Sequence, residues 1–209
     1  MSLQRNILLV DDHLVVRKGV EMILSNSIPG ATIHNVENYD EAIELVNVIK
    51  FDLVILDVNI NGVENIKIMN KIKSIQKELK ILIFSSHDEK QYGVRYIQNG
   101  ADGYLNKFCS EDKIVSVVNE ILESGLFYSK DLKAKLNAKP KKHSNTIEDL
   151  SNREFEIAQL LINGYGNLEI SNKLEIQMST VSTYKNRIFD KLDINNVVAL
   201  SKLLKENSL

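Results

Sequence analysis

Several polar side chains in the first half of this 209-residue sequence follow directly after short apolar runs. The run 53–56 ends at an aspartate, and the runs 7–10, 81–84 and 103–105 lead into polar residues in the same way. The polar residues at these positions are Asp11, Asp12, Asp57, Ser85 and Lys107. Short apolar runs bounded by turn residues are typical of buried strands in a parallel sheet, whose carboxyl ends share one edge. We therefore expect these five side chains to meet at that edge.

This combination of side chains predicts phosphoryl chemistry. Three carboxylates in one crevice would repel one another, so the site requires a hard divalent cation such as Mg2+. A carboxylate such as Asp57 can act as a nucleophile that forms an acyl phosphate. The cation and the Lys107 ammonium would neutralise the incoming phosphoryl oxygens, and the Ser85 hydroxyl can donate to one of them. The alternative is a set of helix caps together with a structural Asp–Lys pair.

The elements that would position these residues alternate along the chain. Strands are expected at 5–10, 31–37, 53–56, 81–84 and 102–105, and helical apolar patterns lie between and after them, at 16–24, 39–49, 66–72, 89–98 and 114–121. Alternation of strands and helices predicts βαβ units with right-handed crossovers. The expected fold class is therefore α/β, with a five-stranded doubly wound parallel sheet and a second, smaller all-α domain.

Composition narrows the class of protein. Hydrophobic residues make up 44% and charged residues 26% of the chain, as in soluble globular proteins. The sequence lacks an apolar run near the ~20 residues of a membrane helix, and residues 1–5 lack the features of a secretory signal. A single cysteine, Cys109, excludes an intrachain disulfide and a Cys-rich metal site. We expect a cytoplasmic protein without membrane contact.

The first half resembles the receiver domain of two-component response regulators. The resemblance rests on Asp11-Asp12, Asp57, Ser85 and the stretch Gly100-Ala101-Asp102-Gly103-Tyr104-Leu105-Asn106-Lys107. It implies a flavodoxin-like fold in which Asp57 accepts a phosphoryl group from a phosphohistidine on a partner histidine kinase. It also implies Mg2+ (or Mn2+) held by Asp12, Asp57 and the backbone carbonyl of Asn59, with Asp11 acting through water.

The same resemblance implies roles for three more residues. Ser85 and Lys107 would contact the phosphoryl group, and Tyr104 would turn inward when Ser85 moves toward that group. Tyr104 could equally be an ordinary half-buried aromatic. The chain departs from the common family pattern at Asn61 and Phe108, where many receivers have proline, and at Ser86, which replaces a small Ala or Gly.

The second half begins after a Lys-rich stretch. Residues 127–146 contain a proline and little apolar periodicity, and the segment 130–142 holds six Lys and one Asp. Such composition predicts an exposed, mobile linker, with one helical turn near Leu132 to Leu136. The expected organisation is therefore a first domain at 1–126, a linker at 127–146 and a second domain at 147–209.

The second domain has the pattern of a helix-turn-helix. Ser151 and Glu154 fit a capping box that opens a first helix, Asn167 can cap a short second helix, and a third helix follows Glu175 to Ser179. The third helix has a polar face without an acidic residue before Asp190. Small polar and basic side chains of this kind suit a DNA groove. The expected DNA contacts are Ser179, Thr180, Ser182, Thr183, Lys185, Asn186 and Arg187.

This second half is similar to the LuxR-type helix-turn-helix. The motifs concerned are Leu150-Ser151-Asn152-Arg153-Glu154, Gly164, Asn167-Leu168-Glu169-Ile170 and the segment 179–192. A receiver followed by this module defines the NarL/FixJ group of response regulators. Ser182 stands where the family often has Lys, so base preference does not carry over. The apolar last helix predicts a homodimer, with a well-buried terminal helix as the alternative.

Together these patterns predict a response regulator whose phosphorylation controls binding to double-stranded DNA and transcription. It would not be an enzyme beyond assisting its own phosphoryl transfer and dephosphorylation. One alternative is a signalling adaptor whose helical module binds protein. The net charge is −5 for residues 1–128 and only +3 for residues 129–209, so charge alone does not indicate a nucleic-acid binder. Another is an aspartyl-phosphate phosphohydrolase, but such enzymes usually carry a second carboxylate where this chain has Asn59.

Overall fold

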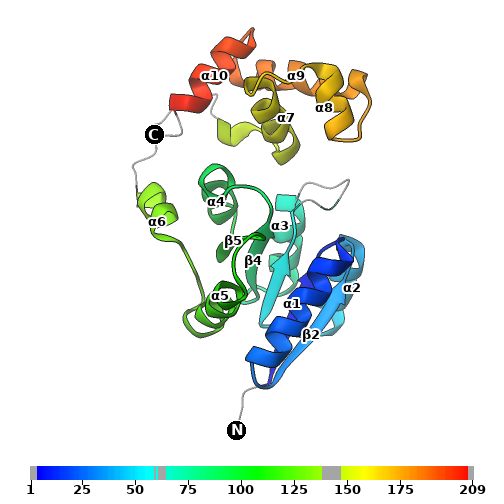
Figure 1. The fold of residues 1–209 in the computed structure, drawn as a ribbon, viewed down its shortest axis with the longest axis vertical. Helices are drawn as coiled ribbons and strands as arrows, with labels where there is room; N and C mark the ends of the chain where they lie inside the picture. Colours follow the sequence, from blue (N-terminus) through cyan, green and yellow to red (C-terminus); the bar gives the residue numbers. More distant parts are fainter. Residues whose placement is uncertain (1–3, 59, 61–64, 138–146, 207–209) are drawn as a thin grey trace. The chain divides into compact units, whose positions relative to one another are not determined.

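The computed structural model describes residues 4–58, 60, 65–137 and 147–206, and divides the chain into two compact units, 1–139 and 140–209. The first unit alternates strands and helices (Figure 1). Its elements are β1 (Arg5–Val10), α1 (Leu14–Ser27), β2 (Ala31–Val36), α2 (Tyr39–Val48), β3 (Leu53–Leu56), α3 (Asn65–Ile75), β4 (Lys80–Ser85), α4 (Glu89–Gln98), β5 (Gly103–Asn106), α5 (Glu111–Ser124) and α6 (Lys130–Asn137).

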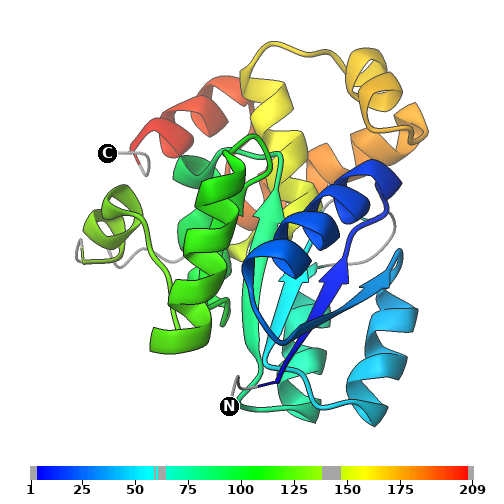
Figure 2. The same ribbon diagram turned by 60° about the horizontal axis from the view of Figure 1, so that its bottom comes forward.

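The five strands form one parallel sheet in the order β2-β1-β3-β4-β5. Helices lie on both of its faces, as Figures 1 and 2 show. Because side chains alternate along a strand, Ile7 and Leu9 join the core formed with α1 and α5, while Leu8 and Val10, also fully buried, face the other way. The predicted doubly wound parallel sheet is confirmed.

The chain after α5 differs from the expected linker. Phe127 is buried and forms a parallel bridge to Gly103. Its backbone N–H donates to the backbone carbonyl of Asp102 at 2.8 Å. Helix α6 then follows and packs against α4, with Leu132 only 2% exposed. The segment 127–137 therefore belongs to the first unit, and the part of the expected linker from 138 to 146 lies outside the described residues.

The second unit is helical. It contains a 3-10 turn (Ile147–Asp149), α7 (Asn152–Ile162), α8 (Asn167–Lys173), α9 (Met178–Leu192) and α10 (Val197–Glu206). Buried apolar side chains from all four α-helices form its core, namely Phe155, Ile157, Ala158, Leu161, Ile170, Val181, Ile188, Leu192, Leu200 and Leu204. The predicted smaller helix-turn-helix domain is thus confirmed as a separate unit.

Local sequence explains how α7 and α8 begin. At α7 the Ser151 hydroxyl accepts from the Glu154 N–H, and the Glu154 carboxylate accepts from the Ser151 N–H at 2.7 Å, which completes the predicted capping box. The expectation that Asn167 caps α8 is wrong. Gly166 is the N-cap, and its N–H donates to Glu169 at 2.7 Å, while the Asn167 side chain donates instead to Ser182 on α9 at 3.1 Å.

Among the described residues, none of the helices combines the length and the apolar character that crossing a bilayer requires.

Candidate functional site

The sheet brings the predicted acidic residues to one edge. β1 is hydrogen-bonded to β2 on one side and to β3 on the other, so Asp11 and Asp57 follow neighbouring strands. The Asp57 N–H donates to the carbonyl of Val10 at 2.8 Å, and the Lys107 N–H donates to the carbonyl of Ser85 at 2.8 Å. The polar residues after β1, β3, β4 and β5 therefore gather where ligands bind in sheets of this topology.

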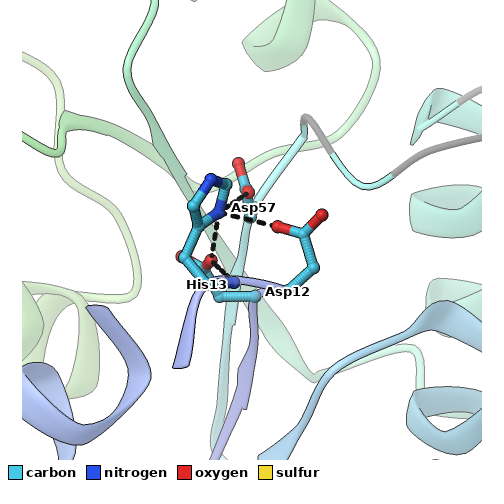
Figure 3. A group of neighbouring side chains, drawn as sticks. Asp12, His13 and Asp57 are labelled. Carbon is cyan, nitrogen blue, oxygen red and sulfur yellow. Dashed lines mark hydrogen bonds and ion pairs between the residues drawn. The ribbon is translucent and has the colours of Figure 1, made fainter. Parts of the chain in front are cut away.

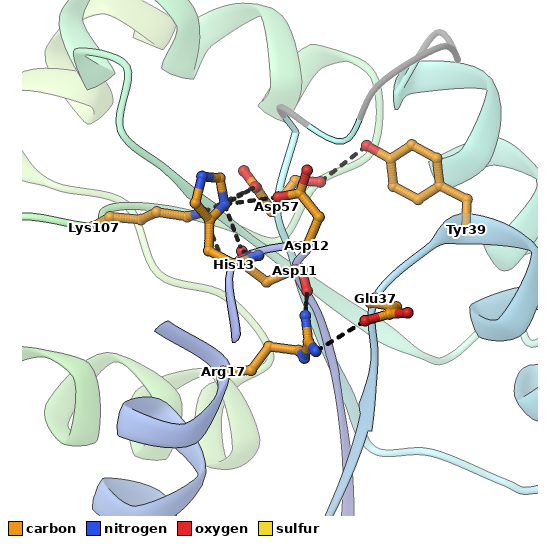
Figure 4. A network of polar contacts seen from close by, with 8 residues as sticks. All are labelled: Asp11, Asp12, His13, Arg17, Glu37, Tyr39, Asp57 and Lys107. Atoms are coloured by element: carbon orange, nitrogen blue, oxygen red, sulfur yellow. Dashed lines mark hydrogen bonds and ion pairs between the residues drawn. The ribbon is translucent and has the colours of Figure 1, made fainter. Parts of the chain in front are cut away.

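Lys107 joins the two most deeply buried carboxylates of this group. Its Nζ lies 2.7 Å from Asp11 Oδ2 and 2.9 Å from Asp57 Oδ2 (Figure 4). The Asp11 and Asp57 side chains are 1% and 0% exposed, and that of Lys107 is 9% exposed. Because these groups are removed from water, the Lys107 ammonium offsets the negative charge that the two buried carboxyl groups bring together.

His13 completes a cluster that sequence reasoning did not assign. Its Nδ1 lies 2.7 Å from Asp12 Oδ1 and 3.9 Å from Asp57 Oδ2 (Figure 3). The same atom lies 3.1 Å from Asp11 Oδ1 (Figure 4). One ligand atom from each of these four residues lies within 4.8 Å of the others. Carboxylate oxygens at this spacing are the donors that a hard divalent cation prefers, so the three aspartates fit such an ion. Asn59, the other expected ligand, lies outside the described residues.

Two further residues hold the backbone of this site and were missed at the sequence level. Arg17, 8% exposed, donates to the Asp11 carbonyl and to Glu37 Oε2, the latter at 3.2 Å (Figure 4). Tyr39 donates its hydroxyl to the Asp57 carbonyl at 3.0 Å. Burial, together with the nearby Asp57 charge, raises the pKa of Tyr39, so the phenol remains a donor. The signal for Arg17 was its position on the same face of α1 as the buried Val20 and Leu24.

Ser85 contacts the loop that leads into α4. Its side chain is fully buried, its Oγ accepts from the His87 N–H at 3.1 Å, and it lies 3.3 Å from His87 Nδ1. The His87 carbonyl accepts from the Tyr104 hydroxyl at 3.0 Å and from Asn106 Nδ2 at 2.9 Å. Burial raises the pKa of Tyr104, although a hydrogen bond with Ser85 acts in the opposite direction. Tyr104 is 1% exposed, so its ring is buried rather than half-buried.

The expected DNA-contacting residues all lie on α9, and the structure separates them into two groups. Ser179, Thr180, Thr183 and Arg187, together with Tyr184, line a shallow hollow of about 270 Å³. The others are Ser182, Lys185 and Asn186. Ser182 is half-buried and its hydroxyl donates to the Met178 carbonyl at 3.2 Å, while the Lys185 ammonium lies 5.7 Å from the centre of the Phe189 ring.

Comparison with known families accounts for both units. Residues 7–119 match the response regulator receiver domain, and residues 148–204 match the bacterial regulatory proteins of the luxR family. The chain belongs to the response regulator family. Its receiver carries the aspartate cluster, and its luxR-type module carries α9. Response regulators of this kind are DNA-binding regulators of transcription, and the predicted NarL/FixJ-type organisation is confirmed.

Relatives of this response regulator match it over nearly its whole length. The Fimbriae Z protein of Salmonella typhimurium is 32% identical over 205 residues, which is 98% of each chain. The response regulator GacA of Pseudomonas aeruginosa is 28% identical over 200 residues, which is 94% of each chain. The RcsB response regulator of Salmonella typhimurium is similar in fold, with a TM-score of 0.59 at 20% identity over 98% of this chain and 99% of RcsB.

Proposed function

We propose that Asp57 is the phosphoacceptor of this response regulator and receives its phosphoryl group from a phosphohistidine on a partner histidine kinase. The observation that carries this is the pairing of Asp57 with Lys107 at 2.9 Å beside Asp11 and Asp12. A buried carboxylate held by one ammonium, with a cation site next to it, suits nucleophilic attack followed by neutralisation of the arriving charge.

The neighbouring residues supply the remaining functions. Asp12, Asp57 and the backbone carbonyl of Asn59 would hold Mg2+ (or Mn2+), with Asp11 acting through water; the ion supplies positive charge to the phosphoryl oxygens. The Lys107 ammonium pairs with another of these oxygens, and the Ser85 hydroxyl donates to a third. Tyr104 fills the space beside Ser85 and reports its movement. Tyr39 and Arg17 fix the backbone on which the two aspartates stand.

Covalent labelling tests this assignment. The full chain is incubated with Mg2+ and a small acyl phosphate, and the phosphorylated peptide is identified by mass spectrometry. Asp57→Asn should abolish the label, because the amide is not a nucleophile. Asp52→Asn is the matched control, since Asp52 pairs with Arg5 at the opposite end of β3 and should leave labelling unchanged. Persistent label in the Asp57→Asn protein would disprove the assignment.

We also infer that α9 binds double-stranded DNA and that the active form is a homodimer. Ser179, Thr183 and Arg187 line one hollow on α9, and basic and small polar side chains suit contact with phosphates and base edges. RcsB, which shares the fold, has been seen bound to a promoter in the presence of a phosphate mimic, with a TM-score of 0.59 at 21% identity.

A gel shift at two salt concentrations tests DNA binding. Arg187→Gln should weaken binding and reduce the salt dependence by about one phosphate contact. Lys202→Gln, which removes an exposed cation from α10, is the matched control. Binding without salt dependence in the wild-type protein would favour a helical module that binds protein instead, and equal salt dependence in wild type and Arg187→Gln would exclude Arg187 from the phosphate contacts.

We infer that this chain assists only its own phosphoryl transfer and dephosphorylation, and that it acts in the cytoplasm, where it would meet the partner kinase and DNA. Asn59 stands two residues after Asp57, so the chain lacks there the carboxylate that a phosphohydrolase uses as acid and base.

A further inference from the structure

Helix α6 packs closely on α4. Leu132 is 2% exposed and lies over Gly93, where a Cβ would be 3.1 Å from Leu132 Cδ1 and 3.0 Å from Glu89 Cγ. A Cβ at position 93 would therefore require the Leu132 and Glu89 side chains to give by a few tenths of an ångström. Figure 1 shows α6 beside α4, outside the layers that cover the sheet. The contact is therefore a fitted one, in which a shift of a few tenths of an ångström is felt.

Polar contacts surround this apolar one. The Lys135 ammonium donates to the Lys90 carbonyl at 3.1 Å, and the Lys90 ammonium lies 3.6 Å from Asp131 Oδ2. At the start of α6, the Ser129 hydroxyl accepts from the Leu132 N–H at 3.1 Å and also hydrogen-bonds the Glu89 carboxylate. Ser129 thus holds the first turn of α6 and joins it to the first turn of α4. One short helix is docked at both its ends.

The residue next to Gly93 leads back to Ser85. Tyr92 is buried, and its ring stacks on that of His87 with centroids 4.6 Å apart. His87 in turn donates its N–H to Ser85 Oγ at 3.1 Å. Three contacts therefore connect the proposed phosphoryl site with α6: Ser85 to His87, His87 to Tyr92, and Gly93 to Leu132.

Phosphorylation of Asp57 would compete with these contacts. If the Ser85 hydroxyl turns to donate to a phosphoryl oxygen on Asp57, its oxygen moves away from the His87 N–H. His87 and the Tyr92 ring stacked on it then shift, and Gly93 shifts with them. Because Leu132 Cδ1 lies 3.1 Å from the place that a Cβ on Gly93 would take, a displacement of Gly93 toward α6 would press on the Leu132 side chain.

We propose that α6 is a latch that is docked on α4 in the unphosphorylated protein and is released when Asp57 is phosphorylated. This inference rests on the proposed function, because phosphorylation supplies the signal. Helix α6 precedes the second unit in the chain, so release of α6 adds residues 130–137 to the segment that connects the receiver core with the DNA-binding unit. Phosphorylation of Asp57 would thereby change the length of this connecting segment.

Hydrogen exchange of the full chain tests the latch. Exchange is measured by mass spectrometry for peptides covering residues 85–88 and 129–137, with Mg2+ alone and with Mg2+ plus beryllofluoride as a phosphoryl mimic. We expect beryllofluoride to change exchange at 85–88 and to speed exchange in 129–137 about 10-fold or more, as in local opening of a docked element. In Leu132→Ser, exchange in 129–137 should already be fast without beryllofluoride. Ala134→Ser, an exposed change on the same helix, should behave as wild type.

A second variant tests the route. Tyr92→Leu keeps α4 apolar but removes the stacking on His87, so 85–88 should respond to beryllofluoride while 129–137 does not. If 85–88 responds in the wild-type protein and 129–137 does not, the latch is wrong and the proposed function stands. If neither segment responds, both the proposed function and the latch are wrong. An equal response of 129–137 in wild type and Tyr92→Leu overturns the route through His87.

Discussion

Replacing Lys107 with methionine should destabilise the receiver strongly when no divalent cation is present. Methionine keeps most of the buried stem but removes the ammonium that lies 2.7 and 2.9 Å from two carboxylates that are 1% and 0% exposed. Removing one partner of a buried ion pair typically costs about 3–5 kcal/mol, because the remaining charge is left uncompensated. Here two carboxylates lose the same counterion, so we expect a value within that range rather than below it.

Hydrogen exchange of β1 and β3 amides is the assay, because it reports on unfolding of the receiver without the second unit. In the presence of a chelator, a loss of about 3–5 kcal/mol should speed exchange of these amides by roughly 100-fold to several thousand-fold. Lys18→Met is the control, since Lys18 is 65% exposed in its pair with Glu21, and such pairs contribute only about 0–1 kcal/mol.

Added Mg2+ should protect the Lys107→Met protein more than the wild type. The variant leaves three carboxylates around the cation site without the competing ammonium, so the ion should bind it more tightly and stabilise it more by mass action. Equal exchange of wild type and Lys107→Met in chelator would refute the view that the ammonium holds these carboxylates together. Equal protection of both proteins by Mg2+ would refute the view that ammonium and cation share one site.

Three further predictions concern stability away from the site. Burial alone would raise the pKa of Glu154, but hydrogen bonds from Lys191 and Ser151 outweigh it and hold that pKa below its ordinary value of 4.5. The carboxylate therefore stabilises the second unit fully above about pH 4.5 and less as the pH falls through the lowered pKa. Exchange of α9 amides should rise more steeply with acid in wild type than in Glu154→Gln, and parallel profiles would contradict this. Gly103→Ala should cost about 1–3 kcal/mol, since its Cβ would meet Ile121 Cδ1 at 2.9 Å and Leu82 Cδ1 at 3.1 Å. Gly19→Ala, with open space around the added Cβ, should instead stabilise α1 by about 0.5–1 kcal/mol, and thermal unfolding distinguishes the two.

The sheet and its acidic edge could be predicted because both depend on local patterns. A buried parallel strand must be almost wholly apolar, so the polar residue that ends it is conspicuous, as at Asp57. Arg17 and Tyr39 were missed because they bond the backbone carbonyls of Asp11 and Asp57. Every residue has a backbone carbonyl, so the sequence does not show which one a side chain will bond.

The sequence indicated one helical turn near Leu132 to Leu136, but the docking of α6 on α4 was missed for a different reason. The Lys-rich composition of this segment is typical of a solvated linker. Its docking depends chiefly on Leu132, which packs over Gly93. That fit joins positions nearly forty residues apart in the sequence, so no periodicity within 130–137 reveals it. The role of Asn167 was misjudged because its amide suits a helix cap equally well, and only the approach of α9 offers it Ser182.

The docking of Phe127 and Leu132 determines where the receiver can be truncated or fused to another output module without loss of stability. A receiver that ends at residue 126 would lack both side chains, which are 7% and 2% exposed in the intact chain. Each such side chain contributes about 1.5–3 kcal/mol when fully buried, so the shortened receiver would lose much of an ordinary stability margin. It would also expose Gly103 and Gly93 to water. A chimaera that exchanges output modules should therefore be joined after Asn137, where the receiver keeps its own last helix.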